Sequence, residues 1–233
     1  MSEVGYANPG KNLQIIVNGK VYERIPVRTH VVMPGENLVE VVKTYALPLL
    51  RPGDVVFITE KIVAVSQGRA FPVKMIRPRK LATFLSRFVT KTRHGIGLGI
   101  PETMEMALRE CGVWRILLAA AVAAVTKPLG RKGDFYRIAG YKASSIDGPT
   151  PNTIPPYNEY VVLGPDKPDE VAKEISEQIN VPVLIVDLND LGGRILGVSD
   201  RKMDKDLYYT ILRDNPLGQS REQTPIGIIR EVK

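Results

Sequence analysis

The stretch from residue 160 to residue 186 constrains the fold most strongly. The pattern predicts a strand at residues 160–163 (YVVL), a helix at residues 166–180 and a second, buried strand at residues 181–186 (VPVLIV). The acidic residues Asp166, Asp169 and Glu170 mark the helix start, because acidic side chains there meet the positive end of the helix dipole. A strand, a helix and a strand in this order predict a right-handed crossover, and therefore a sheet covered by helices.

Other segments predict a fold that mixes strands and helices without a repeat. Apolar residues at helical spacing predict helices near residues 38–45, 81–88 and 104–111, and the last of these is opened by Pro101 and closed by Gly112. Further strands are predicted at residues 13–17, 21–32, 54–59, 135–139 and 225–230. We therefore expect an α+β fold with mixed sheets and helices in a single domain, residues 1–233. It can be divided into lobes 1–146 and 158–233, joined by a proline-rich connection at residues 147–157.

Cysteine usage and the longest apolar run exclude several classes of protein. Cys111 is the single cysteine, which excludes an internal disulfide and a multi-cysteine zinc site, and we expect the reducing cytoplasm as the compartment. The longest apolar run, residues 116–125 (ILLAAAVAAV), is about half of the roughly 20 residues that span a bilayer. It predicts a buried element. The first residues lack the apolar core of a secretory signal, so we expect no membrane partner.

The net charge of +7 is concentrated in one part of the chain. Residues 61–101 contain nine Lys or Arg and no Asp or Glu, and Lys80, Arg87 and Lys91 share one face of a predicted helix. A localised positive region is typical of a protein that binds an anion, although a solvated helix face would look the same. Nucleic acid is an unlikely partner, because the region has no zinc finger, basic zipper or RNP-like pattern. A nucleotide or a phosphorylated metabolite ranks above it.

The segment Val186-Asp187-Leu188-Asn189-Asp190, followed by Gly192-Gly193-Arg194, comes directly after a predicted buried strand. Two carboxylates at a strand exit, beside flexible glycines, can supply the oxygen ligands that Mg²⁺ prefers. The same pattern is also that of an ordinary turn, in which Asp190 makes local hydrogen bonds and Gly192 provides a permissive backbone. The segment alone leaves both interpretations open.

Four motifs in order resemble the coenzyme F420:L-glutamate ligase family. They are residues 52–63 (PGDVVFITEKIV) leading to residues 67–69 (QGR), residues 139–144 (AGYKAS), the segment that begins at Val186, and residues 217–219 (LGQ) running to residues 224–225 (TP). The resemblance implies an F420 ligase-like α+β fold with two lobes, and an intertwined homodimer. It also implies a GTP-dependent enzyme that needs Mg²⁺ or Mn²⁺. Such an enzyme activates a carboxylate as an acyl phosphate, which the amine of glutamate attacks to form an amide.

The resemblance assigns nucleotide contacts to residues at two of these motifs. Thr59, Glu60 and Lys61 correspond to nucleotide-contacting residues of the family, and Arg69 belongs to the glycine–arginine pair of the first motif. This chain departs from the family just before that pair. Val65 stands where a lysine is usual, and residue 67 is Gln where the family has Glu.

The metal ligands implied by the resemblance are only partly present. Asp187 or Asp190 corresponds to one metal-binding aspartate, and Gln219 to a metal-binding Glu or Gln. The other metal-ligating aspartate corresponds to Lys142, and a nearby asparagine to Ser145, so a cation stands where a ligand of a cation is expected. Either the Lys142 side chain points away from the site, or its ammonium group holds phosphate directly and takes over the charge of the metal.

The sequence thus favours a nucleotide-dependent, metal-assisted ligase that forms an amide bond of the γ-glutamyl type on a small carboxylate substrate. We expect GTP or another nucleoside triphosphate with Mg²⁺ or Mn²⁺, metal binding and catalysis by Asp187 and Asp190, and phosphate contacts from Lys61, Arg69 and Lys142. The alternative is a non-catalytic binding or scaffold protein of the same fold that holds a phosphorylated ligand in a basic pocket.

Overall fold

The computed structural model describes residues 6–89, 96–131, 133–190, 192–219 and 221–232, and it divides into two compact units. Unit 1 comprises residues 1–68 and 165–233, and unit 2 comprises residues 69–164. The chain therefore passes between the units twice, and the proline-rich segment 147–157 lies inside unit 2. The predicted Lys91 lies outside the described residues.

Unit 1 is built on a six-stranded mixed sheet in the order β1-β2-β8-β3-β6-β7. Only the β3–β6 pair is parallel, and the other neighbouring pairs are antiparallel. The strands of this sheet are β1 (Gln14–Val17), β2 (Lys20–Val27), β3 (Val55–Thr59), β6 (Val183–Asn189), β7 (Gly192–Val198) and β8 (Ile226–Val232). The α+β fold with mixed sheets is confirmed.

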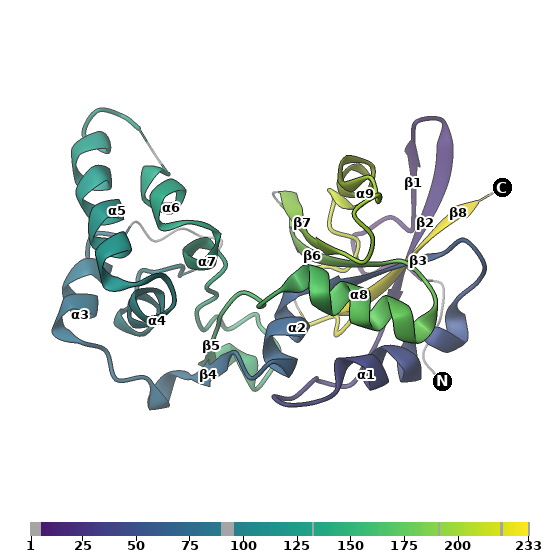
Figure 1. The fold of residues 1–233 in the computed structure, drawn as a ribbon, viewed down its shortest axis with the longest axis horizontal. Helices are drawn as coiled ribbons and strands as arrows, with labels where there is room; N and C mark the ends of the chain where they lie inside the picture. Colours follow the sequence, from purple (N-terminus) through teal and green to yellow (C-terminus); the bar gives the residue numbers. More distant parts are fainter. Residues whose placement is uncertain (1–5, 90–95, 132, 191, 220, 233) are drawn as a thin grey trace. The chain divides into compact units, whose positions relative to one another are not determined.

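Helices cover both faces of this sheet (Figure 1). On one face lie α1 (Leu38–Tyr45), α2 (Glu60–Ser66) and α8 (Pro168–Ile179), which contact one another, and on the other lies α9 (Lys205–Leu212). Val55 and Phe57 of β3 pack in the cluster that contains Ile211 of α9, while Val56 and Ile58 point to the opposite face and are also buried. Burial on both faces explains why β3 is continuously apolar.

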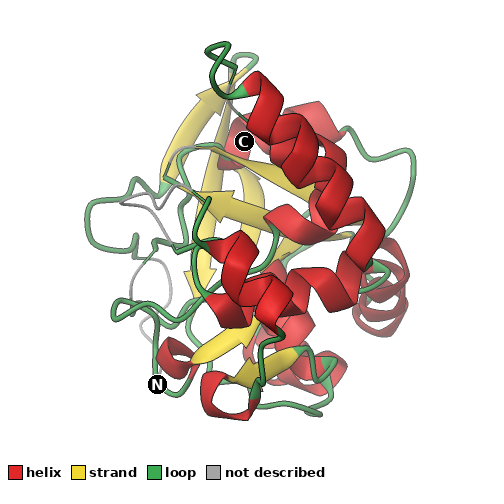
Figure 2. Cartoon of the chain, turned by 90° about the vertical axis from the view of Figure 1, so that its left-hand side faces the viewer, coloured by secondary structure: helices red, strands yellow, loops and turns green. Residues whose placement is uncertain are grey.

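Unit 2 is mainly helical. Figure 2 shows the helices of the whole chain in red and the strands in yellow. Unit 2 contains a two-stranded antiparallel sheet and five α-helices among its described residues: β4 (Ala70–Pro72), β5 (Tyr160–Val162), α3 (Lys80–Ser86), α4 (Pro101–Cys111), α5 (Val113–Thr126), α6 (Asp134–Ala139) and α7 (Tyr141–Ser144). Its own core gathers Met104 and Leu108 of α4, Ile116 of α5 and Val161 of β5. Each unit therefore has a hydrophobic core of its own.

The predicted crossover at residues 160–186 is wrong, although its helix is confirmed as α8. β5 pairs with β4 in the small sheet, whereas β6 lies in the six-stranded sheet beside β3. The three elements were predicted from local patterns, but the partner of a strand depends on residues far away in the chain. The parallel neighbour of β6 is β3, which precedes it by more than a hundred residues.

Two further predictions are corrected in unit 2. Residues 135–139 form the helix α6 and not a strand, and it is bounded by Gly133 and Gly140, which both have positive φ. Five residues with partial alternation fit either element, and packing against α5 decides for the helix. The apolar run 116–125 lies in α5, but Ile116 and Ala119 are the buried residues of that helix, so the run is mostly not buried.

Candidate functional site

The carboxyl ends of two parallel strands define a candidate site in unit 1. β3 and β6 are paired so that Thr59 stands opposite Val186. Glu60 and Lys61 follow in the first turn of α2, and Asp187 follows on β6. In sheets that carry parallel strands, ligands bind preferentially beyond the carboxyl ends of those strands. The structure therefore brings four of the predicted site residues to one edge of the sheet.

The loop before β8 lies at the same edge. The Thr59 backbone N–H donates a hydrogen bond to the Pro225 carbonyl at 2.9 Å. The N-terminal segment ties the loop down, because the Asn8 Nδ2 donates to the Leu217 carbonyl and to Thr224 Oγ1, both at 2.8 Å. Three distant parts of the chain thus meet where β3 ends.

Asp190 and Gln219, two predicted metal ligands, lie together. The Asp190 backbone N–H donates to Gln219 Oε1 at 3.1 Å. The Asp190 carboxylate, however, is already engaged. Its Oδ1 accepts from Lys11 Nζ at 2.7 Å and from Asn215 Nδ2 at 3.2 Å. The hydrogen bond from Lys11 lowers the pKa of Asp190, against a smaller opposing effect of burial, so this carboxylate is ionised near neutral pH.

Asp187 precedes Asp190 closely in the chain but is held differently. It belongs to β6 itself, opposite Arg194 of β7. β7 was not predicted, because Gly192 and Gly193 suggested a turn rather than a strand. Gly193 lies so close to the Asp187 carbonyl and to Leu188 that a Cβ could not be accommodated there. The two glycines therefore allow the hairpin that holds Asp187 at the edge of the sheet.

The described residues do not fit a resident divalent metal. They contain no group of three or more His, Cys, Asp and Glu side chains that could hold a metal ion. A lysine ammonium group contacts the Asp190 oxygen that would be a ligand, and the Gln219 amide oxygen accepts a backbone hydrogen bond. Mg²⁺ takes about six oxygen ligands, and the remaining ones would have to come from water and substrate.

The predicted residues of unit 2 form a separate cluster around Glu110. Glu110 Oε1 accepts from Arg69 Nη2 at 2.7 Å and from Lys142 Nζ at 3.0 Å. Burial raises the pKa of Glu110, but the hydrogen bonds from Lys142 and Arg69 outweigh it and hold the pKa below the ordinary value. Lys142 is therefore an ion-pair partner of a carboxylate, with one acid between two cations.

Arg115 and Ser145 complete the surroundings of this cluster. Arg115 Nε donates to the Ile138 carbonyl at 2.9 Å, and its guanidinium lies where a Cβ on Gly140 would have to stand. Ser145 is buried at the C-terminal end of α7. The Glu110 cluster carries a surplus of positive charge, in keeping with unit 2 as a whole, which has 15 Lys and Arg against six Asp and Glu.

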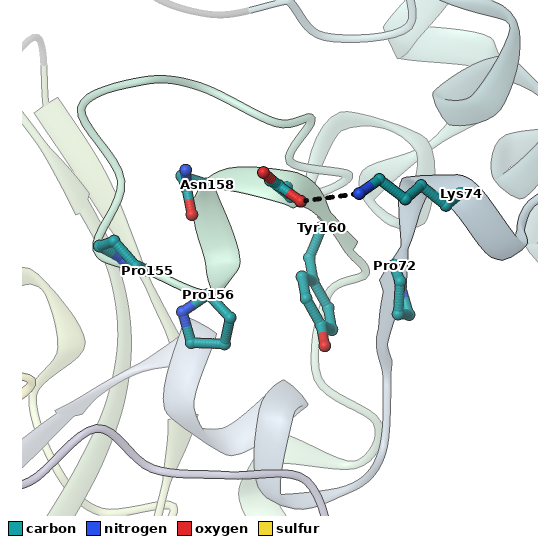
Figure 3. Close-up of a pocket in the computed structure, with 7 residues that line it drawn as sticks. Pro72, Lys74, Pro155, Pro156, Asn158 and Tyr160 are labelled. Carbon is teal, nitrogen blue, oxygen red and sulfur yellow. Dashed lines mark ion pairs between the residues drawn. The ribbon is translucent and has the colours of Figure 1, made fainter.

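A shallow hollow of about 450 Å³ also lies in unit 2 (Figure 3). It is lined by Pro72, Lys74, Pro155, Pro156, Asn158, Glu159 and Tyr160. Lys74 and Glu159 face each other across 3.8 Å, and both side chains are exposed. None of the predicted site residues lines this hollow. Its proline side chains carry no group that could transfer a proton or bind a metal. The hollow is therefore not the candidate site.

Sequence reasoning missed Lys11 and Glu110, and it did not identify the partner of Asn215. Glu110 stands at the end of a predicted helix, where an acid has no special meaning. Lys11 is 179 residues away from Asp190, and no local pattern could connect them. The positive φ of Asn215 is typical of a tight turn, but the partner of its side chain could not be read from the sequence.

The fold is α+β, and the ends of the parallel strands β3 and β6 form its candidate site. The family of F420-0:gamma-glutamyl ligases matches residues 26–203, which is well over half of the chain. The chain belongs to this family. No curated protein matches it significantly. Among the described residues, no helix is long and apolar enough to span a bilayer. Lys11 and Gln219 lie outside the matched range.

Proposed function

We propose that this chain is a nucleotide-dependent ligase that forms an amide bond of the γ-glutamyl type on a small carboxylate substrate. The observation that carries the proposal is the family match over residues 26–203, which includes the strand ends with Thr59, Glu60, Lys61 and Asp187. The expected co-substrate is GTP or another nucleoside triphosphate. It is expected to arrive as its Mg²⁺ or Mn²⁺ complex, with the metal held by the phosphates of the nucleotide.

The reaction has two steps in this proposal. A carboxylate oxygen of the substrate attacks the γ-phosphorus, and the nucleoside diphosphate leaves, which gives an acyl phosphate. The amine of the amino acid then attacks the acyl carbon and loses a proton, and inorganic phosphate leaves with the former carboxylate oxygen. Positioning and neutralisation of phosphate charge are the main tasks of a protein in phosphoryl transfer.

The residues of this chain can be given roles in those steps. Lys61, in the first turn of α2 after the end of β3, is proposed to neutralise phosphate charge. Asp187, on β6, is proposed to attract the ammonium group of the amino acid and to accept its proton. Arg69 and Lys142 are ion-paired with Glu110 within unit 2, and they are given no role in these two steps.

The test is product formation with the substrates that the family name supplies. The purified chain is incubated with F420-0, L-glutamate, Mg²⁺ and either GTP or ATP, and the products are analysed by mass spectrometry. We expect a product that has gained one glutamyl residue, with nucleotide diphosphate released in equal amount. Asp187→Asn should reduce the rate by about a hundredfold or more, as removal of a proton acceptor does. The exposed Asp200→Asn is the control and should retain full activity.

One specific observation favours a second candidate, a binding protein of the same fold without turnover. Asp190 and Glu110 are each engaged by a lysine ammonium group. Calorimetry of nucleotide binding, read together with the product assay, separates the two functions. Binding of nucleotide without any glutamyl product would support the binding protein, and no binding at millimolar nucleotide would refute both.

We propose in addition that a second copy of the chain covers α5. Trp114, Leu118 and Val125 are 85%, 59% and 67% exposed. With about 3.6 residues per turn, all three lie on one face of the helix, and an exposed apolar stripe of this kind is typical of an interface. Light scattering should give the mass of a dimer for the wild type and of a monomer for Leu118→Glu. A wild-type monomer at high concentration would refute the proposal.

A further inference from the structure

Lys11 is held at Asp190 by more than one contact. Its Nζ lies 2.7 Å from Asp190 Oδ1 and 3.1 Å from the Asp214 carbonyl oxygen. The Lys11 side chain is only 16% exposed, whereas the Asp190 side chain is 55% exposed. The ammonium group is thus the more enclosed partner, which is unusual for lysine, a residue that normally keeps its charge in water.

The N-terminal segment that carries Lys11 is itself fixed. Asn8, three residues before Lys11, donates hydrogen bonds to Leu217 and to Thr224 in the loop before β8. The Lys11 backbone N–H donates to the Asn8 carbonyl at 2.9 Å, which closes a turn between them. The N-terminal segment therefore fixes the position of the Lys11 ammonium group.

The ammonium group contacts oxygens of the kinds that a metal ion would seek. A hard divalent cation at this edge would seek carboxylate, carbonyl and amide oxygens. Lys11 Nζ contacts a carboxylate oxygen of Asp190 and a carbonyl oxygen of Asp214, and the amide of Gln219 bonds the backbone of Asp190. A divalent ion bound to the same Asp190 oxygen would be repelled by the neighbouring positive charge.

The same substitution of charge occurs in unit 2. Lys142 stands at a position where the sequence comparison with the family led us to expect a metal-ligating aspartate, and its ammonium group contacts Glu110 at 3.0 Å. Lys11 precedes the residues that match the family, so nothing in that match accounts for it. Two lysines from different parts of the chain thus pair with acids: Lys11 with Asp190, a predicted metal ligand, and Lys142, at the position of an expected ligand, with Glu110.

We propose that Lys11 is the built-in cation of the Asp190 site and that it excludes a resident divalent metal from it. Lys11 is a positioning residue in this proposal, because it fixes the Asp190 carboxylate and the loop that carries Gln219. The exclusion of a metal from this site does not depend on the proposed ligase function.

Titration of the free chain with Mn²⁺, without nucleotide, tests the proposal. Electron paramagnetic resonance reports the free aqueous ion, whose signal falls when the protein binds it. We compare the wild type, Asp190→Asn, Lys11→Met, Lys11→Arg and the double variant Lys11→Met/Asp190→Asn. Methionine keeps much of the length of lysine but not its charge, and arginine keeps the charge. Circular dichroism verifies that each variant is folded.

Three results are expected. Mn²⁺ binding to the wild type should not change in Asp190→Asn. Lys11→Met should bind Mn²⁺ at least about tenfold more tightly than the wild type, a typical size for a group that tunes a metal site, and the double variant should lose this gain. Lys11→Arg should behave as the wild type.

Either of two results would overturn the proposal. The first is wild-type Mn²⁺ affinity that falls by about tenfold or more in Asp190→Asn, since the metal would then coexist with Lys11. The second is a folded Lys11→Met that binds Mn²⁺ no better than the wild type. If Lys11→Met does not fold, the comparison of the wild type with Asp190→Asn decides alone. Neither measurement uses nucleotide or turnover, so failure of the ligase assay would leave the answer intact.

Discussion

Glu110→Gln is the substitution whose effect the structure predicts in most detail. Glutamine keeps the shape of the side chain and removes the charge that Arg69 and Lys142 contact. The Glu110 side chain is 14% exposed and the Arg69 side chain 21%, so this pair is largely enclosed, whereas Lys142 is 59% exposed and contributes little. The effect should therefore come mainly from Arg69.

The expected loss of stability is about 2 kcal/mol. A hydrogen bond to a charged group contributes about 1.5–3 kcal/mol, and leaving one partner of a fully buried pair costs about 3–5 kcal/mol. Because Arg69 is partly exposed, the expected loss of stability lies near the lower of these two ranges. Urea denaturation followed by circular dichroism measures it. The control is Glu159→Gln, whose ion pair with Lys74 is exposed and spans 3.8 Å, and which should change stability by less than about 0.5 kcal/mol.

The pH dependence of this difference has a definite sign. The pKa of Glu110 is lower in the folded chain than in the unfolded chain. Its contribution is therefore full above the unfolded carboxyl pKa of about 4.3 and is lost as the pH falls through the lower folded pKa. The gap between the wild type and Glu110→Gln should be constant from about pH 7 to pH 5 and shrink below that. A gap that is absent at neutral pH, or that persists unchanged in acid, would refute the reasoning.

Three further predictions concern the stability of unit 1, each measured by urea denaturation. Gly227→Ala should destabilise the chain by about 2 kcal/mol, because its Cβ would overlap the ring of Phe57. In the double variant, Phe57→Leu should restore part of this loss. Equal stability of the two single variants and the double variant would contradict this. Asp54→Asn should cost about 3 kcal/mol, because the buried carboxylate accepts two hydrogen bonds from Arg230, and the exposed Glu174→Gln is its control. Asp204→Ala should cost about 1 kcal/mol through loss of the cap on α9, and Asp204→Asn should restore most of it; no loss in the alanine variant would be the contrary result.

Residues that mark the ends of helices predicted some elements well. α4 begins at Pro101 and ends before Gly112, whose φ of 85° suits glycine. α8 has the acidic start that was expected and ends at Ile179, and Asn180, which caps it, has a left-handed backbone. These signals lie within a few residues of the helix ends that they mark, which is why a sequence alone can carry them.

Pairing between distant residues could not be predicted in the same way. The assignment of β5 to the small sheet depends on β4, and the extent of burial of α5 depends on which neighbours reach it. At the candidate site, the sequence indicated Thr59 at the end of β3 and Asp187 near the end of β6, because each follows an apolar run. The ion pairs of Lys11 with Asp190 and of Lys142 with Glu110 depend on tertiary contacts alone.

The central claim is that this chain activates a carboxylate as an acyl phosphate. The most direct measurement uses a carboxylate substrate labelled with oxygen-18 in its carboxyl group, incubated with the chain, nucleotide and L-glutamate. Mass spectrometry of the inorganic phosphate then follows the label. The proposed steps predict one labelled oxygen in each phosphate released, in proportion to the amide formed. Amide formation with unlabelled phosphate would contradict the account.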